Sequence, residues 1–144
     1  MAKPILILTV GLPRAGKTTW AQKQGIPMVC PDAIRRALHG RRFVEESEPM
    51  VWLIARYMVK SLFLAGHRKV ILDDAIHVIK KRREEWRNEA WKLQVKVFRT
   101  SREDCIHRCI GSVDGDVLSG VINFMADRWE EVGDEIDGPY EEDI

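Results

Sequence analysis

The sequence of 144 residues is long enough for one domain with a substantial core and too short for two ordinary ones, and its hydrophobic content of 45% excludes a disordered or fibrous chain. The net charge of +1 conceals an asymmetry. Residues 1–129 hold all 23 Lys and Arg with 14 acidic residues, a net +9, whereas residues 130–144 hold eight acidic residues and no basic one. A basic body is typical of a protein with a polyanionic partner. We therefore predict a folded domain over residues 1–132 and an acidic tail over residues 133–144.

The cysteine count and the hydropathy of the sequence indicate the cellular compartment in which the protein should reside. Three cysteines, an odd number, argue against a disulfide scaffold and favour a reducing environment. The apolar run at residues 5–8 is too short for a signal core and leads into a glycine loop. No segment approaches the ~20 apolar residues that cross a bilayer. We expect a cytoplasmic protein with no membrane partner, and no stable protein partner is implied.

Apolar patterning and turn residues predict strands that alternate with helices. In chain order we expect a strand at 5–10, a helix at 17–24, a strand at 27–30, a helix at 31–38, a charged connection at 41–46, a helix at 47–65, a strand at 70–72, a helix whose apolar face includes residues 79, 86, 90 and 93, a strand at 94–99, a helix at 101–110, a loop at 111–116 and a helix at 118–132. This alternation predicts an α/β fold with a short, mainly parallel sheet.

Residues 11–18, GLPRAGKT, match the phosphate-binding pattern G-x-x-x-x-G-K-[ST] between a predicted strand and a predicted helix. The glycines let the backbone N–H groups surround phosphates at the positive end of the helix. Lys17 should reach the β and γ phosphates, and the Thr18 hydroxyl should ligate Mg²⁺. The nucleotide-binding residues that we predict are Gly11, Leu12, Pro13, Arg14, Ala15, Gly16, Lys17, Thr18 and Thr19. ATP and Mg²⁺ are thus the expected ligands.

A second group of polar residues should lie at the carboxyl edge of the sheet, where ligands of open α/β folds gather. Asp32 follows the second predicted strand and could accept a proton from an attacking hydroxyl, although it could equally cap a helix. Arg35, one helical turn later, could stabilise a transferring phosphoryl group. Asp73 and Asp74 end the third strand, where a carboxylate could hold a Mg²⁺-bound water or orient Arg35, or be merely solvated. We select Asp74 as a catalytic candidate.

Basic residues elsewhere suggest a lid and a nucleic-acid contact. Arg102 and Arg108 flank a short helix that could cover the triphosphate, or they could be ordinary surface residues. Arg82 and Arg83, within the cluster at residues 80–83, could contact a nucleic-acid phosphate, although such a run is more often a solvated face. The five tryptophans are predicted mainly as core residues rather than as base-stacking platforms.

These motifs resemble known kinases. Residues 5–20 resemble the opening of phage polynucleotide kinases, and Asp32 and Arg35 match the general base and the phosphoryl-stabilising arginine of that family. The segments PDAIR (31–35), ALHG (37–40), EPMVW (48–52), LAGH (64–67) and KRREEW (81–86) look like phage P-loop DNA kinases, including those that phosphorylate 5-hydroxymethyluracil in DNA. The resemblance covers about residues 3–130 and implies a three-layer P-loop kinase fold with a small helical lid that carries Arg108.

The chain departs from the family at two places. Residues 75–77 are Ala-Ile-His where the family usually has a Thr-Asn pair, and Ser112 stands where the polynucleotide kinases carry a second lid arginine. The resemblance implies transfer of the γ-phosphate of ATP to DNA, at the 5-hydroxymethyl group of 5-hydroxymethyluracil, in the cytoplasm of a host cell. The alternatives are a polynucleotide 5′-hydroxyl kinase, a nucleoside or other small-molecule kinase, and a non-catalytic nucleotide-binding module.

Overall fold

The computed structural model describes residues 2–40 and 43–143. In chain order the elements are β1 (Ile5–Val10), α1 (Lys17–Lys23), β2 (Met28–Val29), α2 (Pro31–His39), η1 (Glu45–Ser47), α3 (Glu48–Leu64), β3 (Lys69–Leu72), η2 (Ala75–Val78), α4 (Lys80–Glu84), β4 (Lys92–Phe98), α5 (Arg102–His107), α6 (Gly115–Asp127) and β5 (Glu141–Asp143), where η denotes a 3₁₀ helix. The predicted charged connection at 41–46 lies partly outside the described residues, because it includes residues 41 and 42.

The strands form a parallel sheet in the order β2-β3-β1-β4-β5, with five strands among the described residues. Strand β1 lies at the centre, where Leu6 pairs with Val70 of β3 and with Leu93 of β4. Leu6, Leu8 and Val10, which share one face of β1, are fully buried; on the other face Thr9 is fully buried, and Ile5 and Ile7 are partly buried. The α/β architecture with a mainly parallel sheet is thereby confirmed.

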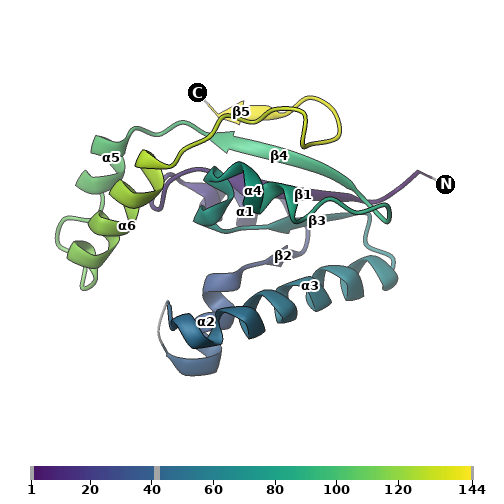
Figure 1. Ribbon diagram of the computed structural model, residues 1–144, viewed down its shortest axis with the longest axis horizontal. Helices are drawn as coiled ribbons and strands as arrows, with labels where there is room; N and C mark the ends of the chain where they lie inside the picture. The colour runs from purple at the N-terminus through teal and green to yellow at the C-terminus, as the bar shows by residue number, and fades with distance from the viewer. Residues whose placement is uncertain (1, 41–42, 144) are drawn as a thin grey trace.

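The ribbon places the helices along one edge and at one end of this sheet. Helices α2 and α3 lie beside the β2 edge, and α5 and α6 lie together at the end toward which β4 points (Figure 1). A second apolar cluster of Leu12, Phe98, Cys105, Leu118 and Ile122 joins α5 and α6 to the loop after β1. The phosphate-loop segment therefore sits between the carboxyl ends of the strands and the α5–α6 unit.

Most predicted elements are confirmed, but the prediction that residues 79, 86, 90 and 93 lie on one helical face is wrong. Helix α4 ends at Glu84, and Leu93 belongs to β4. The Asn88 side chain accepts a hydrogen bond from the Ala90 N–H in a turn, and the Trp91 indole N–H donates to the Trp86 carbonyl. The apolar spacing thus reflects burial of a turn and a strand rather than one helical face. The last helix likewise ends at Asp127, short of the predicted residue 132.

The acidic C-terminal segment packs against the body of the protein. Ile136 joins the main core cluster, the Asp137 N–H donates to the Leu93 carbonyl at 2.8 Å, and β5 pairs with β4. Ion pairs link this segment and the residues just before it to basic side chains of the body: Lys80–Asp134, Arg83–Glu135, Arg87–Asp137, Lys96–Glu141 and Arg99 with Glu131 and Glu142. Much of the charge asymmetry in the sequence is therefore compensated within the fold. None of the described helices is both long and apolar enough to cross a bilayer.

Candidate active site

The phosphate-loop residues fold into the conformation that the motif predicts. Gly16 has φ +98° and Arg14 has φ +70°, so the loop turns sharply before α1. A Cβ at Gly11 would lie 3.0 Å from the Phe98 Cβ, which explains the need for glycine at that end. The Lys17 ammonium donates to the Leu12 carbonyl at 2.7 Å. Burial lowers the pKa of Lys17, although the carboxylates of Asp73 and Asp74 oppose that change.

Asp73, which the sequence did not single out as a catalytic candidate, lies at the phosphate loop. Its carboxylate accepts hydrogen bonds from the Thr18 hydroxyl at 2.6 Å and from the Thr9 hydroxyl at 2.7 Å, and Asp73 is only 4% exposed. A threonine hydroxyl beside a carboxylate at the end of a neighbouring strand is the donor set that Mg²⁺ uses next to nucleotide phosphates. The sequence held no signal that separates Asp73 from Asp74, because the parallel pairing of β1 with β3, which brings the end of β3 to the phosphate loop, is seen only in the structure.

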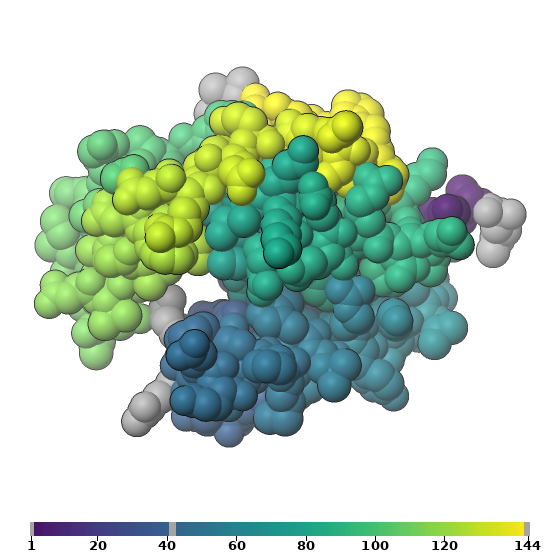
Figure 2. Space-filling model, viewed as in Figure 1, coloured from purple at the N-terminus to yellow at the C-terminus, as the bar shows by residue number. Residues whose placement is uncertain are grey.

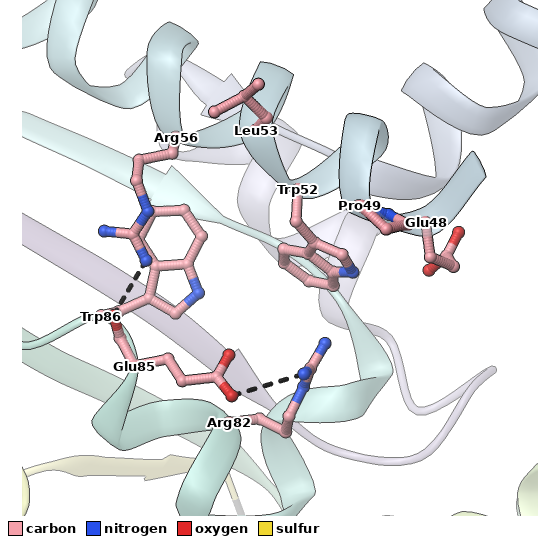
Figure 3. A pocket seen from close by; sticks show the side chains of 8 residues that line it. All are labelled: Glu48, Pro49, Trp52, Leu53, Arg56, Arg82, Glu85 and Trp86. Atoms are coloured by element: carbon pink, nitrogen blue, oxygen red, sulfur yellow. Dashed lines mark hydrogen bonds and ion pairs between the residues drawn. The ribbon is translucent and has the colours of Figure 1, made fainter. Parts of the chain in front are cut away.

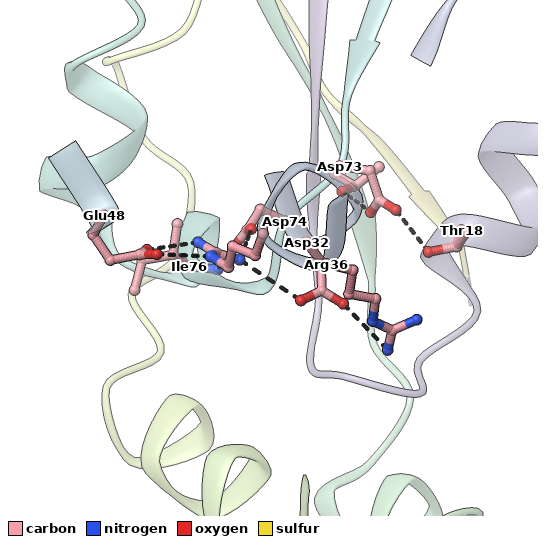
Figure 4. A network of polar contacts seen from close by, with 9 residues as sticks. Thr18, Asp32, Arg36, Glu48, Asp73, Asp74 and Ile76 are labelled. Atoms are coloured by element: carbon pink, nitrogen blue, oxygen red, sulfur yellow. Dashed lines mark hydrogen bonds and ion pairs between the residues drawn. The ribbon is translucent and has the colours of Figure 1, made fainter. Parts of the chain in front are cut away.

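A second polar network joins the end of β3 to α2 and α3 (Figure 4). The Arg35 guanidinium donates from Nε and Nη2 to the Glu48 carboxylate at 2.9 and 2.8 Å, and from Nη1 to Asp74 at 3.1 Å. Asp32 lies 3.9 Å from Arg35 and 3.6 Å from Arg36, measured between nitrogen and carboxylate oxygen. The structure therefore brings Asp32, Arg35 and Asp74 together, as the sequence reasoning expected.

These contacts define how Arg35 is held. Burial disfavours its charge, but hydrogen bonds to Glu48 and ion pairing with Asp74 outweigh that effect and raise the pKa of Arg35. Asp74 also accepts a hydrogen bond from the Ile76 N–H at 3.0 Å, which fixes its carboxylate at the start of η2. Asp74 thus orients Arg35, while contact of either residue with a phosphoryl group or with Mg²⁺ stays a prediction.

The two candidate lid arginines behave differently. Arg108, at the end of α5, donates to the Arg14 carbonyl of the phosphate loop at 2.8 Å. Arg102 instead donates to Asp127 at 2.8 Å, which ties α5 to α6. The space-filling view is hollowed between α2 and the α5–α6 unit (Figure 2). Among the predicted lid residues, Arg108 is thus the one that the structure places at the phosphate loop.

Arg82 and Arg83 also differ in burial and in their partners. Arg83 is fully buried, and its guanidinium donates to Glu135 at 2.7 Å and to the His77 carbonyl at 2.7 Å. The prediction that Arg83 contacts nucleic acid is therefore wrong, because the buried guanidinium pairs with Glu135 of the C-terminal segment. Arg82 is partly exposed beside Trp52, so its contact with nucleic acid remains a prediction.

His77 occupies the interior behind the network, at the position where the resembled family has a polar pair. It is fully buried and packs edge-on against Trp52 with ring centroids 6.2 Å apart. Burial lowers the pKa of His77 to about 4, although the charges of Asp74 and Asp73 oppose this. The imidazole is therefore neutral in the folded protein at neutral pH.

This burial predicts a pH dependence of stability. Between the unfolded pKa of about 6.5 and the folded value of about 4, the unfolded chain binds a proton that the native protein does not, so stability falls as pH falls. We expect urea unfolding of the His77→Gln variant to show a shallower decline from pH 6.5 to 5, by up to about 1 kcal/mol per pH unit. His67→Gln, at an exposed position, should keep the slope of the original protein. Equal slopes in all three proteins would contradict a buried neutral His77.

The residues present fit ATP and Mg²⁺. The tight approach at Gly11 and the positive φ at Gly16 leave the backbone, rather than side chains, to face a phosphate chain. The Lys17 ammonium, the Thr18 hydroxyl and the Asp73 carboxylate supply one cation and two oxygen ligands of the kind that nucleotide phosphates and Mg²⁺ require.

Comparison with known proteins gives the family. The model of an AAA domain family matches residues 6–118, which is most of the chain and includes the phosphate loop, Asp32, Asp73 and Arg108. The chain belongs to this AAA domain family. No match is found among curated proteins.

Solved structures with the same fold support the architecture of this AAA domain. A putative kinase from Chloroflexus aurantiacus superposes with a TM-score of 0.68 at 15% identity, covering 97% of this chain and 87% of that one. A chain of the Pnkp1/Rnl/Hen1 RNA repair complex gives 0.66 at 18% identity, covering 90% of this chain and 47% of that one, so the present chain spans about half of it. A gluconokinase from Sinorhizobium meliloti gives 0.61 at 18% identity, covering 99% and 83%. The predicted P-loop kinase fold is confirmed.

Proposed function

We propose that the protein is an ATP-dependent kinase that transfers the γ-phosphate to a hydroxyl group of DNA, namely the 5-hydroxymethyl group of 5-hydroxymethyluracil. The observation that carries this proposal is the Asp32 carboxylate, which lies beside Arg35 at the same sheet edge as the Thr18–Asp73 pair. Kinase names among proteins of the same fold support phosphoryl transfer. The base acceptor rests on the resemblance of the acceptor segments to phage DNA kinases.

In the proposed reaction Asp32 accepts the proton of the acceptor hydroxyl, so that the oxygen can form a bond to phosphorus. The bond between the γ-phosphorus and the bridging oxygen breaks, and ADP leaves with that electron pair. Bound Mg²⁺ would neutralise charge on the phosphates. Lys17 and Arg108 lie on the side of the phosphate loop and can counter the charge that spreads over the transferred group. An internal base must leave the helical stack or belong to a single strand to reach Asp32.

The second candidate is a polynucleotide 5′-hydroxyl kinase. The specific observation in its favour is the structural similarity to a chain of the Pnkp1/Rnl/Hen1 RNA repair complex, at a TM-score of 0.66. The same Asp32 and phosphate loop would serve both reactions, so the two candidates differ only in which hydroxyl enters the site.

A transfer assay with γ-labelled ATP and Mg²⁺ separates the candidates. Three acceptors are compared: DNA that contains 5-hydroxymethyluracil, unmodified DNA with a 5′-hydroxyl, and free nucleosides. We expect label on internal nucleotides of the modified DNA after digestion. Label at the DNA end would replace this proposal by the end-kinase candidate. Transfer to nucleosides alone would contradict both DNA reactions, and no transfer with ATP still bound would favour a nucleotide-binding module.

A further inference from the structure

A groove outside the phosphate site combines aromatic and cationic side chains (Figure 3). It lies between α3 and the segment of α4 and its following turn, with a volume of about 420 Å³. This volume is in the range of ligand-binding pockets. The residues that line it are Glu48, Pro49, Trp52, Leu53, Arg56, Arg82, Glu85 and Trp86.

The walls of the groove are planar groups. The Arg56 guanidinium lies 4.3 Å from the centroid of the Trp86 ring and donates to the Glu85 carbonyl at 2.9 Å, so it is held as a flat cationic plate. The Arg82 guanidinium lies 5.3 Å from the Trp52 ring. Trp52 packs against the core, as predicted for most of the tryptophans, and its indole also lines the groove. Indole and guanidinium planes are the surfaces on which unpaired bases stack.

The groove is continuous with the proposed acceptor site. Glu48 lines one end and also accepts two hydrogen bonds from Arg35. The Arg35 guanidinium lies 5.8 Å from the Trp52 ring and 3.9 Å from Asp32. From residue 48 to residue 56 the helix rises about 12 Å, the length of about three to four stacked nucleotides. A strand with one nucleotide at Asp32 would therefore reach the groove with its neighbours.

The groups of the groove suit a ligand that carries both phosphates and flat rings. Among the lining residues two cations, Arg56 and Arg82, stand with two carboxylates, Glu85 and Glu48. The Glu85 carboxylate lies 3.4 Å from Arg82, and Glu48 pairs with Arg35, which also contacts Asp74. An acidic peptide would leave the stacking surfaces of the indole and guanidinium planes unused, which favours nucleic acid.

We propose that this groove binds single-stranded nucleic acid next to the acceptor nucleotide, with a base stacked on Trp52 and the Arg56 plate and a backbone phosphate at Arg82. This inference rests on the proposed function for its location, since it extends the acceptor site. Its chemistry is independent of phosphoryl transfer, because binding along the groove requires neither ATP nor Asp32.

The test is binding of a 3′-fluorescein-labelled single strand of eight nucleotides, measured by anisotropy without ATP. We expect Trp52→Leu to bind about tenfold more weakly, because one base loses its stacking partner. Arg82→Gln should lower the slope of log K against log salt by about 0.7, the value of one phosphate contact in a single strand. Arg68→Gln, an exposed arginine in the turn before β3, should keep both affinity and slope. A duplex should compete less well than the single strand.

The outcomes distinguish the two proposals. If the protein phosphorylates DNA and both groove variants bind the strand like the original protein, the groove proposal is wrong and the function stands. If the protein transfers no phosphate but the groove variants lose affinity for the strand, the proposed kinase function is wrong and the proposed binding groove is supported. The groove proposal would also be wrong if an acidic peptide displaced the strand and all variants, Arg68→Gln included, lost the same amount of affinity for the strand. Should Trp52→Leu unfold by circular dichroism, the salt slope of Arg82→Gln decides.

Discussion

Replacing Asp32 by asparagine should reduce phosphoryl transfer about 10²- to 10⁴-fold, because the amide cannot accept the proton of the acceptor hydroxyl. Asp32 lies in the first turn of α2, one turn before Arg35. Both of its carboxylate oxygens lie within 4 Å of an arginine nitrogen. Asparagine keeps the size of the side chain and one oxygen acceptor, and replaces the other oxygen by an NH₂ donor. The expected loss is therefore in kcat, while the affinity for ATP, measured by titration with a fluorescent analogue, should change less than twofold.

The matched control is Asp134→Asn, the same chemical change at an exposed carboxylate that pairs with Lys80 far from the phosphate loop. It should transfer phosphate at the rate of the original protein. Undiminished transfer by Asp32→Asn would show that another group accepts the proton. Loss of ATP affinity in that variant would instead mean that Asp32 shapes the nucleotide site rather than the acceptor site.

The parts of the fold that depend on local sequence could be predicted. Residues 5–10 alternate little and end at a glycine, which indicates a strand buried on both faces, and the structure gives β1 the same bounds. Pro31 and Gly40 bound α2 because proline suits the first helical turn and glycine accepts the left-handed conformation, here φ +69°, at the helix end. These signals act within a few residues and need no knowledge of the tertiary contacts.

The parts that depend on distant partners could not be predicted. Asp73 and Asp74 are equivalent in the sequence, yet Asp73 meets Thr18, 55 residues away, and Asp74 meets Arg35, 39 residues away. The strand order decides which carboxylate faces which partner. Arg83 and Glu135 are likewise members of charge runs in the sequence, and only the packing of the C-terminal segment shows that they form a buried pair. Patterns of charge alone do not distinguish such a pair from solvated residues.

The buried Arg83–Glu135 pair predicts the largest loss of stability. Both side chains are almost completely buried, 0% and 1% exposed, and lie 2.7 Å apart. Burial disfavours the charge of Glu135, but its hydrogen bonds from Arg83 and from the Gly133 N–H hold its pKa below the ordinary value. Arg83 also donates to the carbonyls of His77, Glu130 and Glu131, so it links η2 to the C-terminal segment.

Glu135→Ala should lower the free energy of unfolding by about 3–5 kcal/mol, because it leaves the Arg83 charge buried without its partner. Since single domains are stable by only about 5–15 kcal/mol, this loss can unfold part of the protein at 37 °C. Urea denaturation followed by circular dichroism measures it. Glu142→Ala removes an exposed partner of Arg99 and should cost no more than about 1 kcal/mol.

The acidic segment over residues 133–144 also contributes to stability through its buried residues. Glu135 and Ile136 are both buried, so deletion of the chain after Val132 should destabilise the domain. The variant that decides is the double replacement Arg83→Met with Glu135→Leu, which removes both charges and should recover most of the stability lost in Glu135→Ala. If Glu135→Ala is as stable as Glu142→Ala, the C-terminal segment does not anchor the fold through this pair.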